Sequence, residues 1–84
     1  MAHPAASGAD WQGRVISVHS EWQFVVTNLG WDAVDVGEVV SIYRQDKLLA
    51  KARIERVQER ASAATLLPEW LHAEVQVNDV VRVL

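Results

Sequence analysis

Two valine-rich segments of this chain are closely similar: VDVGEVVSIY at residues 34–43 and VQVNDVVRVL at residues 75–84. An offset of 41 residues aligns four valines of the first segment with four of the second. The matched valines are Val34, Val36, Val39 and Val40 with Val75, Val77, Val80 and Val81. An offset of 39 residues aligns GRVISV (13–18) with ARIERV (52–57). The pattern predicts two copies of a strand–strand–loop–strand unit, at about residues 13–43 and 52–84.

A three-stranded unit is not expected to fold alone, because it has two unpaired edges and one apolar face with no partner. Two such units that pair about a pseudo-twofold axis join their edges and cover both apolar faces. The sequence therefore predicts an all-β fold, a small six-stranded barrel built from two pseudo-twofold-related β-β-loop-β halves.

Six short segments rich in β-branched residues are the predicted strands. They are residues 13–18, 22–29, 38–43, 48–57, 62–67 and 79–84. A tight polar hairpin is expected at 44–47. Residues 46–67 contain many good helix formers, so a helix is the alternative there. The alternation of small apolar residues with charged residues over 50–55, together with the repeat, favours a strand.

The composition is that of one small domain, with half of the residues hydrophobic and 23% charged. Residues 1–10, rich in Ala, Ser, Gly and Pro, are predicted to be a disordered lead-in, so the barrel domain spans residues 11–84. No apolar run approaches the roughly 20 residues of a membrane-spanning helix. The chain has no cysteine, which excludes disulfides and thiolate sites.

Turn-forming residues occupy matching places in the two copies. Gly37 and Asn78 precede the last strand of each copy, and both residue types tolerate a positive φ. The acid that follows, Glu38 or Asp79, is expected to accept backbone N–H groups of the turn. Gly30 closes the second strand. These five residues are the predicted structural turns.

The order valine, glycine or asparagine, acid, two valines resembles the GD box of the cradle-loop barrels. These six-stranded barrels include AbrB-like swapped-hairpin factors, RIFT barrels and double-psi barrels. The run from Gly13 to Leu84 is also similar to the family of the C-terminal domain of flagellar assembly protein T. The similarity is carried by Gly13-Arg14-Val15, Asn28-Leu29-Gly30, Val34 to Glu38 and Ile42-Tyr43-Arg44. Asn78 departs from the pattern, which has glycine there. The resemblance implies a bacterial envelope-associated barrel, in the periplasm or cell envelope.

Candidates for proton transfer at neutral pH are the histidines, His3, His19 and His72. His19 lies beside Ser20 and Glu21, but neighbouring side chains of a strand point to opposite faces and do not form a Ser–His–acid set. His72 lies between Glu69 and Glu74 and has no second histidine at ligand spacing. The glycines form no phosphate-binding loop. We therefore expect no catalytic residue, no metal, no cofactor and no enzymatic activity.

Trp31 and Trp70 occupy matching positions in the two long loops. One interpretation is that their indole rings plug the two ends of the barrel, because an indole buries a large area. The alternatives are an aromatic contact surface, since tryptophan is enriched among interface anchors, or a platform for sugar stacking.

Residues 44–60 contain six basic and three acidic residues, in a chain whose net charge is −3. The basic residues are Arg44, Lys47, Lys51, Arg53, Arg56 and Arg60. The simplest interpretation is a solvated hairpin arm whose charges oppose edge pairing. The alternatives are a docking face for an acidic protein or for nucleic acid.

The sequence thus predicts a non-enzymatic accessory or protein-interaction module of a larger, envelope-associated bacterial protein. The envelope location comes from the resemblance only. The alternative is a nucleic-acid-binding barrel that uses the basic segment 44–60, which the negative net charge disfavours. A protein partner is expected. The oligomeric state stays open, with the C-terminal strand as a candidate edge for pairing between molecules.

Overall fold

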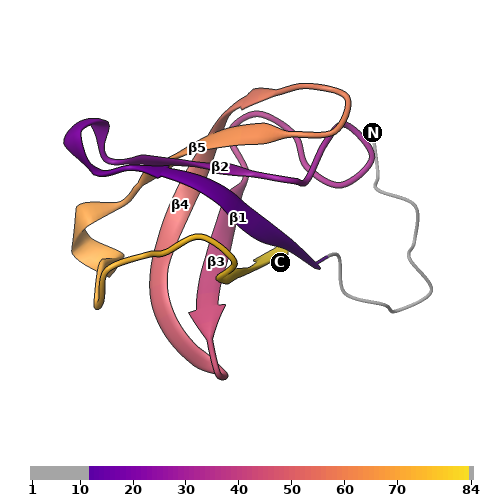
Figure 1. The fold of residues 1–84 in the computed structure, drawn as a ribbon. Coiled ribbons are helices and arrows are strands. Elements are labelled where there is room, and N and C mark those ends of the chain that lie inside the picture. The colour runs from indigo at the N-terminus through magenta and orange to yellow at the C-terminus, as the bar shows by residue number, and fades with distance from the viewer. Residues whose placement is uncertain (1–11, 84) are drawn as a thin grey trace.

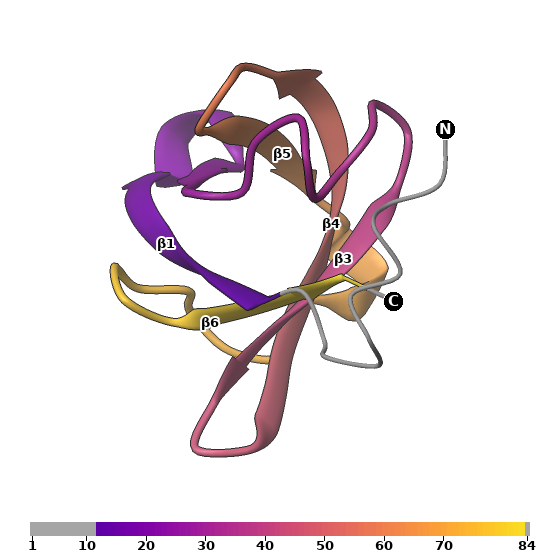
Figure 2. The same ribbon diagram turned by 90° about the vertical axis from the view of Figure 1, so that its right-hand side faces the viewer.

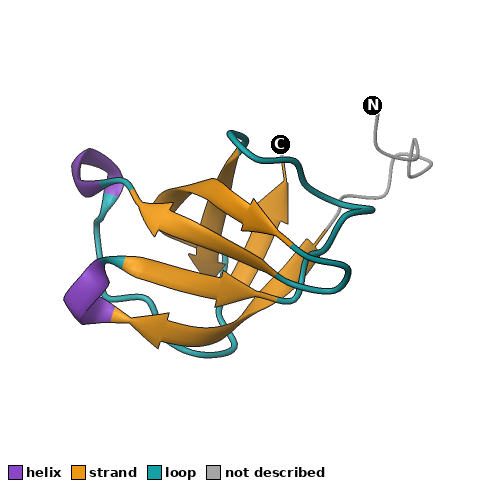
Figure 3. Ribbon diagram, turned by 90° about the horizontal axis from the view of Figure 1, so that it is seen from above, coloured by secondary structure: helices purple, strands orange, loops and turns teal. Residues whose placement is uncertain are grey.

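A computed structural model describes residues 12–83, which form a β-barrel (Figure 1). Its strands are β1 (Gln12–His19), β2 (Phe24–Thr27), β3 (Val39–Arg44), β4 (Lys47–Val57), β5 (Ser62–Leu66) and β6 (Val80–Val83). Two 3-10 turns, η2 (Ser20–Trp22) and η3 (Pro68–Trp70), lie at the same end of the barrel (Figure 3). The predicted lead-in at 1–10, and Trp11 and Leu84 at the limits of the predicted domain, lie outside the described residues.

The strands close into a ring in the order β1-β2-β5-β4-β3-β6, and every neighbouring pair is antiparallel (Figure 2). The predicted all-β, six-stranded barrel is confirmed, and residues 46–67 form the hairpin of β4 and β5, not a helix. The interpretation of the C-terminal strand as a free edge is wrong, because closing the ring pairs β6 with both β1 and β3. Within residues 12–83, no helix is long and apolar enough to cross a membrane.

The connectivity has the form expected of a duplicated unit. The ring order is unchanged when β1, β2 and β3 are exchanged with β4, β5 and β6. The register of β1 against β2 shifts between Val15 and Ser17, and the register of β4 against β5 shifts at the matching place, between Ile54 and Arg56. The rotation that would relate the two halves stays a prediction.

The turn before β3 joins the first half of the chain to the first strand of the second half. Gly37 has a φ of 94°, as expected for this position. Its N–H donates to the carbonyl of Ile54 at 2.7 Å, and the N–H of Ile54 donates to the carbonyl of Glu38 at 2.7 Å. The carboxylate of Glu38 accepts the N–H of Asp35 at 2.7 Å, which confirms the predicted turn contact.

The turn before β6 repeats this arrangement with the halves exchanged. Asn78 has a φ of 78°. Its N–H donates to the carbonyl of Val15 at 2.8 Å, and the N–H of Val15 donates to the carbonyl of Asp79 at 2.9 Å. The carboxylate of Asp79 accepts the N–H of Gln76 at 2.7 Å. Each half is therefore bonded to the first strand of the other half by an equivalent pair of backbone hydrogen bonds.

Gly30 is required for a different reason, the close approach of two loops. A Cβ at Gly30 would overlap the backbone carbonyl of Glu59. The N–H of the next residue, Trp31, donates to the carbonyl of Gln58 at 3.1 Å. The loop after β2 is thus held directly against the loop between β4 and β5.

Aliphatic side chains from all six strands fill the barrel. The buried residues are Val15, Val25, Leu29, Ala33, Val34, Val40, Ile42, Leu49, Ala50, Ala52, Ile54, Ala64, Leu66, Val75 and Val81. The predicted alternation on β4 is confirmed, since Ala52 and Ile54 are fully buried and Arg53 is exposed. The buried hydroxyls of Thr27 and Ser62 satisfy each other at 2.7 Å.

The interpretation that Trp31 and Trp70 plug the barrel ends is wrong. Their exposed fractions are 63% and 41%, whereas the shorter Val34 and Val75 in the same two loops are buried. The interior of a small barrel is just wide enough for close-packed aliphatic side chains, so the larger indoles remain outside. Both tryptophans are therefore surface residues.

Substitutions at Gly37 test the need for a positive φ. Gly37→Asn should unfold at nearly the wild-type temperature, because asparagine supports the same backbone at the matching turn. Gly37→Val should lower the free energy of unfolding by about 1–2 kcal/mol, since a β-branched residue is strained at positive φ. A Cβ at this position would meet no atom within 4 Å, so a steric clash would not contribute. Thermal unfolding followed by circular dichroism measures both variants, and equal stabilities would contradict the assignment.

Candidate functional site

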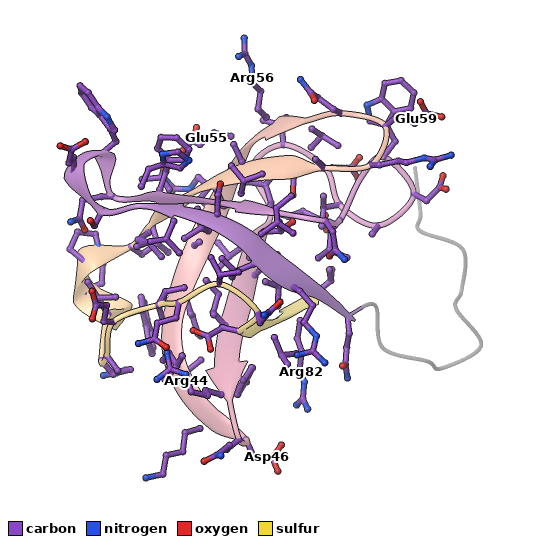
Figure 4. All side chains as sticks on the ribbon, viewed as in Figure 1. Arg44, Asp46, Glu55, Arg56, Glu59 and Arg82 are labelled. Carbon is purple, nitrogen blue, oxygen red and sulfur yellow. The ribbon has the colours of Figure 1, made fainter. Side chains whose placement is uncertain are left out.

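The six basic residues of the 44–60 segment do not form one surface. Arg44 and Arg56 project from opposite sides of the barrel (Figure 4). Lys47 is exposed at the start of β4, next to the hairpin turn. Arg60 is exposed in the loop after β4, where it borders a hollow with Asp32. The remaining three, Lys51, Arg53 and Arg56, lie along β4.

Arg44, which the sequence places in the candidate interaction surface, forms an ion pair within the barrel. Its Nε donates to Oδ1 of Asp79 at 2.8 Å, and its Nη2 donates to Oδ2 at 2.9 Å. Nη2 also donates to the carbonyl of Glu74 at 2.9 Å. This two-pronged contact ties the end of β3 to the turn before β6. We therefore assign Arg44 to the stability of the barrel.

The contact changes the proton affinity of both partners. Burial raises the pKa of Asp79, but the hydrogen bonds from Arg44 and from the N–H of Gln76, together with the charge of Arg44, outweigh burial and leave the pKa below its ordinary value. The hydrogen bond to Asp79 is also the main reason that the pKa of Arg44 is raised. The pair is therefore ionised at neutral pH.

Three basic side chains and both matched tryptophans lie along the outer side of β4. The Nζ of Lys51 lies over the ring of Trp70, 4.0 Å from its centroid. At the other end of the strand, the Nε1 of Trp31 donates to the carbonyl of Val57 at 3.3 Å. Lys51 and Val57 are about 20 Å apart along an extended strand. The group is Trp70, Lys51, Arg53, Arg56 and Trp31, and we call it the β4 face.

A shallow trough runs beside the β4 face, along the outer side of β5. The outward residues of β5 are the small Ala63 and Thr65, and their neighbours on both adjoining strands are larger. The register forms two rows across β2, β5 and β4: Phe24, Thr65 and Arg53, and Val26, Ala63 and Arg56. Small residues between larger ones leave a depression on the sheet surface.

Two hollows lie along the trough. One of about 150 Å³ is lined by Val26, Arg56, Gln58, Ala61, Ser62 and Ala63. The other, of about 330 Å³, is bounded by Trp22, Phe24, Glu55, Arg56, Ala63 and Thr65. Trp22 stands at its rim with 72% of its surface exposed. Arg56 and Ala63 border both hollows, so the two hollows are neighbours along the trough.

Sequence reasoning did not identify Trp22, Phe24, Val26 or Ala63 as site residues. A signal was present in the unbroken apolar run of residues 24–26. A strand covered on one face alternates apolar and polar residues, whereas an unbroken apolar run indicates that both faces are apolar. In this barrel Val25 points to the core, and its two neighbours form the apolar wall of the trough.

The histidines make surface contacts. The ring of His19 stacks on Phe24 with centroids 4.5 Å apart, and its Nε2 lies 3.1 Å from Oγ of Ser17. The ring of His72 meets Trp70 edge to face at 6.4 Å. Among residues 12–83, no three His, Asp or Glu side chains are grouped so that they could hold a metal ion. His3 lies outside the described part of the chain.

Comparison with family models, curated proteins and solved structures gives no match in any of the three. The role of the β4 face and its trough is therefore inferred from their own shape, charge and exposure.

Removing the negative charge of Asp79 should destabilise the barrel. Asp79→Asn is expected to lower the free energy of unfolding by about 2 kcal/mol and Tm by on the order of 10 °C, because it weakens a charged contact with a half-exposed arginine. Asp46→Asn is the matched control, since Asp46 is 93% exposed and lies 3.8 Å from Arg82. Equal stabilities of the two variants would contradict the structural role of Asp79.

The same contact predicts loss of stability in acid. Because the folded pKa of Asp79 is below the unfolded value, its contribution is full above about pH 4, the ordinary aspartate pKa, and is lost as pH falls through the folded pKa. Urea unfolding of the wild type should therefore show a steeper decline in this acid range than unfolding of Asp79→Asn. Parallel pH profiles would show that Asp79 does not cause the decline.

Proposed function

We propose that this barrel is a non-enzymatic accessory module that binds another protein through the β4 face and the adjoining trough. The proposal rests on one observation. Two arginines without a partner among residues 12–83 lie beside an apolar depression on the same outer wall. The guanidinium groups of Arg53 and Arg56 form no hydrogen bond or ion pair with any residue in 12–83. Arginine and tryptophan are the residues most enriched at the energetic centres of protein interfaces.

The form of the barrel supports recognition by side chains. Each described strand is paired on both sides, so the ring offers no open edge to which a partner strand could add. The interior is filled by buried aliphatic residues. The outer wall is the surface on which a partner can gain contact area, and the trough is an apolar depression beside arginines that have no partner among residues 12–83.

The proposal places the barrel in a larger, envelope-associated bacterial protein. This part rests on the similarity of residues 13–84 to the C-terminal domain family of flagellar assembly protein T. The matching hydrogen bonds of the turns at Gly37 and Asn78 support the pseudo-twofold arrangement that this resemblance implies.

Selection from a peptide library displayed on phage tests the proposed surface. Immobilised wild-type protein should enrich a defined set of peptides, and Ala63→Glu should abolish their binding by filling the trough with a charged side chain. Val77→Glu is the matched control: Val77 is 52% exposed in the turn before β6, and β6 is opposite β5 in the ring. Failure to enrich any peptide, or equal losses with both variants, would refute the proposed surface.

Single-stranded nucleic acid is the second candidate, favoured by the contact of Lys51 with Trp70 and by the exposed Trp31 at the other end of the strand. Cations interleaved with aromatic rings are typical of such sites. The net charge of −3 disfavours nucleic acid, which is a dense polyanion.

Retention on immobilised poly(dT) separates the two candidates. The protein-binding proposal predicts no retention at low salt. A nucleic-acid site would instead give retention that falls steeply as salt is added and that is lost in Arg53→Ala. That second result would replace the first proposal.

A further inference from the structure

We propose that the segment bound in the trough is an extended acidic peptide whose carboxylates pair with Arg53 and Arg56 and whose aliphatic side chains occupy the hollows. This inference rests on the proposed function of the same surface. It adds the chemical class of the partner, which follows from the shape of the trough and from the position of its charges.

The shape of the trough suits an extended chain. The two hollows follow one another along β5 and meet at Ala63. In an extended peptide, alternate side chains point to the same side and recur at about 7 Å. Such a chain can therefore place successive side chains of one face into successive hollows. Because the strands beneath it are paired, its affinity must come from side-chain contacts.

The small hollow indicates an aliphatic side chain. Its lining includes the apolar Val26, Ala61 and Ala63 beside the polar residues Arg56, Gln58 and Ser62. The larger hollow is lined by the exposed indole of Trp22 and by Phe24, so it suits a larger apolar side chain. Burying apolar side chains against these walls is favourable in proportion to the area removed from water.

The charges around the hollows indicate carboxylates. Arg56 borders both hollows, and Arg53 lies in the next row of the sheet. A guanidinium group binds a carboxylate through two parallel hydrogen bonds, and neither arginine has such a partner among residues 12–83. Lys51, by contrast, already lies against Trp70.

Glu55 limits where the acidic residues can lie. It borders the larger hollow, and its side chain and that of Arg56 both project from the outer wall (Figure 4). A carboxylate of the ligand inside that hollow would be repelled by Glu55. The peptide should therefore place an apolar side chain in the larger hollow and its carboxylates outside it, on the guanidinium groups of Arg53 and Arg56.

Fluorescence anisotropy with two matched probes tests the inference. One probe is a fluorescein-labelled peptide of repeated Val-Ser-Glu-Ser, in which valine and glutamate alternate on one face of an extended chain, and the other has lysine in place of glutamate. Wild-type protein should bind the acidic peptide at least about tenfold more tightly than the basic one. The double variant Arg53→Glu with Arg56→Glu should reverse this preference. Lys47→Glu is the control, because it reverses one charge outside the β4 face. It should leave the preference for the acidic peptide unchanged.

The outcomes separate this inference from the proposed function. One outcome is that phage selection yields peptides that Ala63→Glu rejects while the two probes bind equally, or while the double reversal has no effect on their binding. Either result would support binding of protein by the module and refute the acidic ligand. If selection also yields nothing, both proposals fail. If wild-type protein sediments as a dimer that the double reversal dissociates, a second copy of the chain occupies the trough and the acidic peptide is refuted.

Discussion

The barrel depends on two turns that each bond to the first strand of the opposite half. Gly37 and Glu38 exchange backbone hydrogen bonds with Ile54, and the corresponding pair at 78–79 exchanges them with Val15. These bonds hold the start of one half against the end of the other, which closes the ring and leaves each described strand paired on both sides. The ion pair of Arg44 with Asp79 strengthens the second turn from β3.

Closure determines what kind of surface the molecule presents. Because the backbone groups are used in the ring and aliphatic side chains fill its interior, differences between the outer walls come from side chains alone. On the wall formed by β2, β5 and β4, the small outward residues of β5 lie between the apolar side chains of β2 and the arginines of β4. That wall combines apolar area, exposed indole rings and guanidinium groups that have no partner among residues 12–83, which is why we propose it as the recognition surface.

The strands and turns were predictable because their signals are local. Positive φ values at Gly37 and Asn78 follow from the residue types and their position before a valine-rich strand. The valine repeat was informative in detail, since the matched Val34 and Val75 are both buried and the matched Val36 and Val77 are both exposed. The exposure of Trp31 and Trp70 was not predictable in this way, because it depends on the width of the barrel ends. The partner of Arg44 depends on the packing of β3 against β6, which joins residues 35 positions apart in the chain.

By itself the sequence determined the β class of the fold, the number and approximate bounds of the strands, the turn residues and the matching positions of the two valine-rich segments. These features depend on periodicity, on backbone tolerance and on repeated residues, all of which are visible along the chain. Only the tertiary structure decided which charged residues are paired, which remain free, and where small residues of one strand face larger residues of its neighbours. Those properties depend on the register between strands, and register is set by barrel closure.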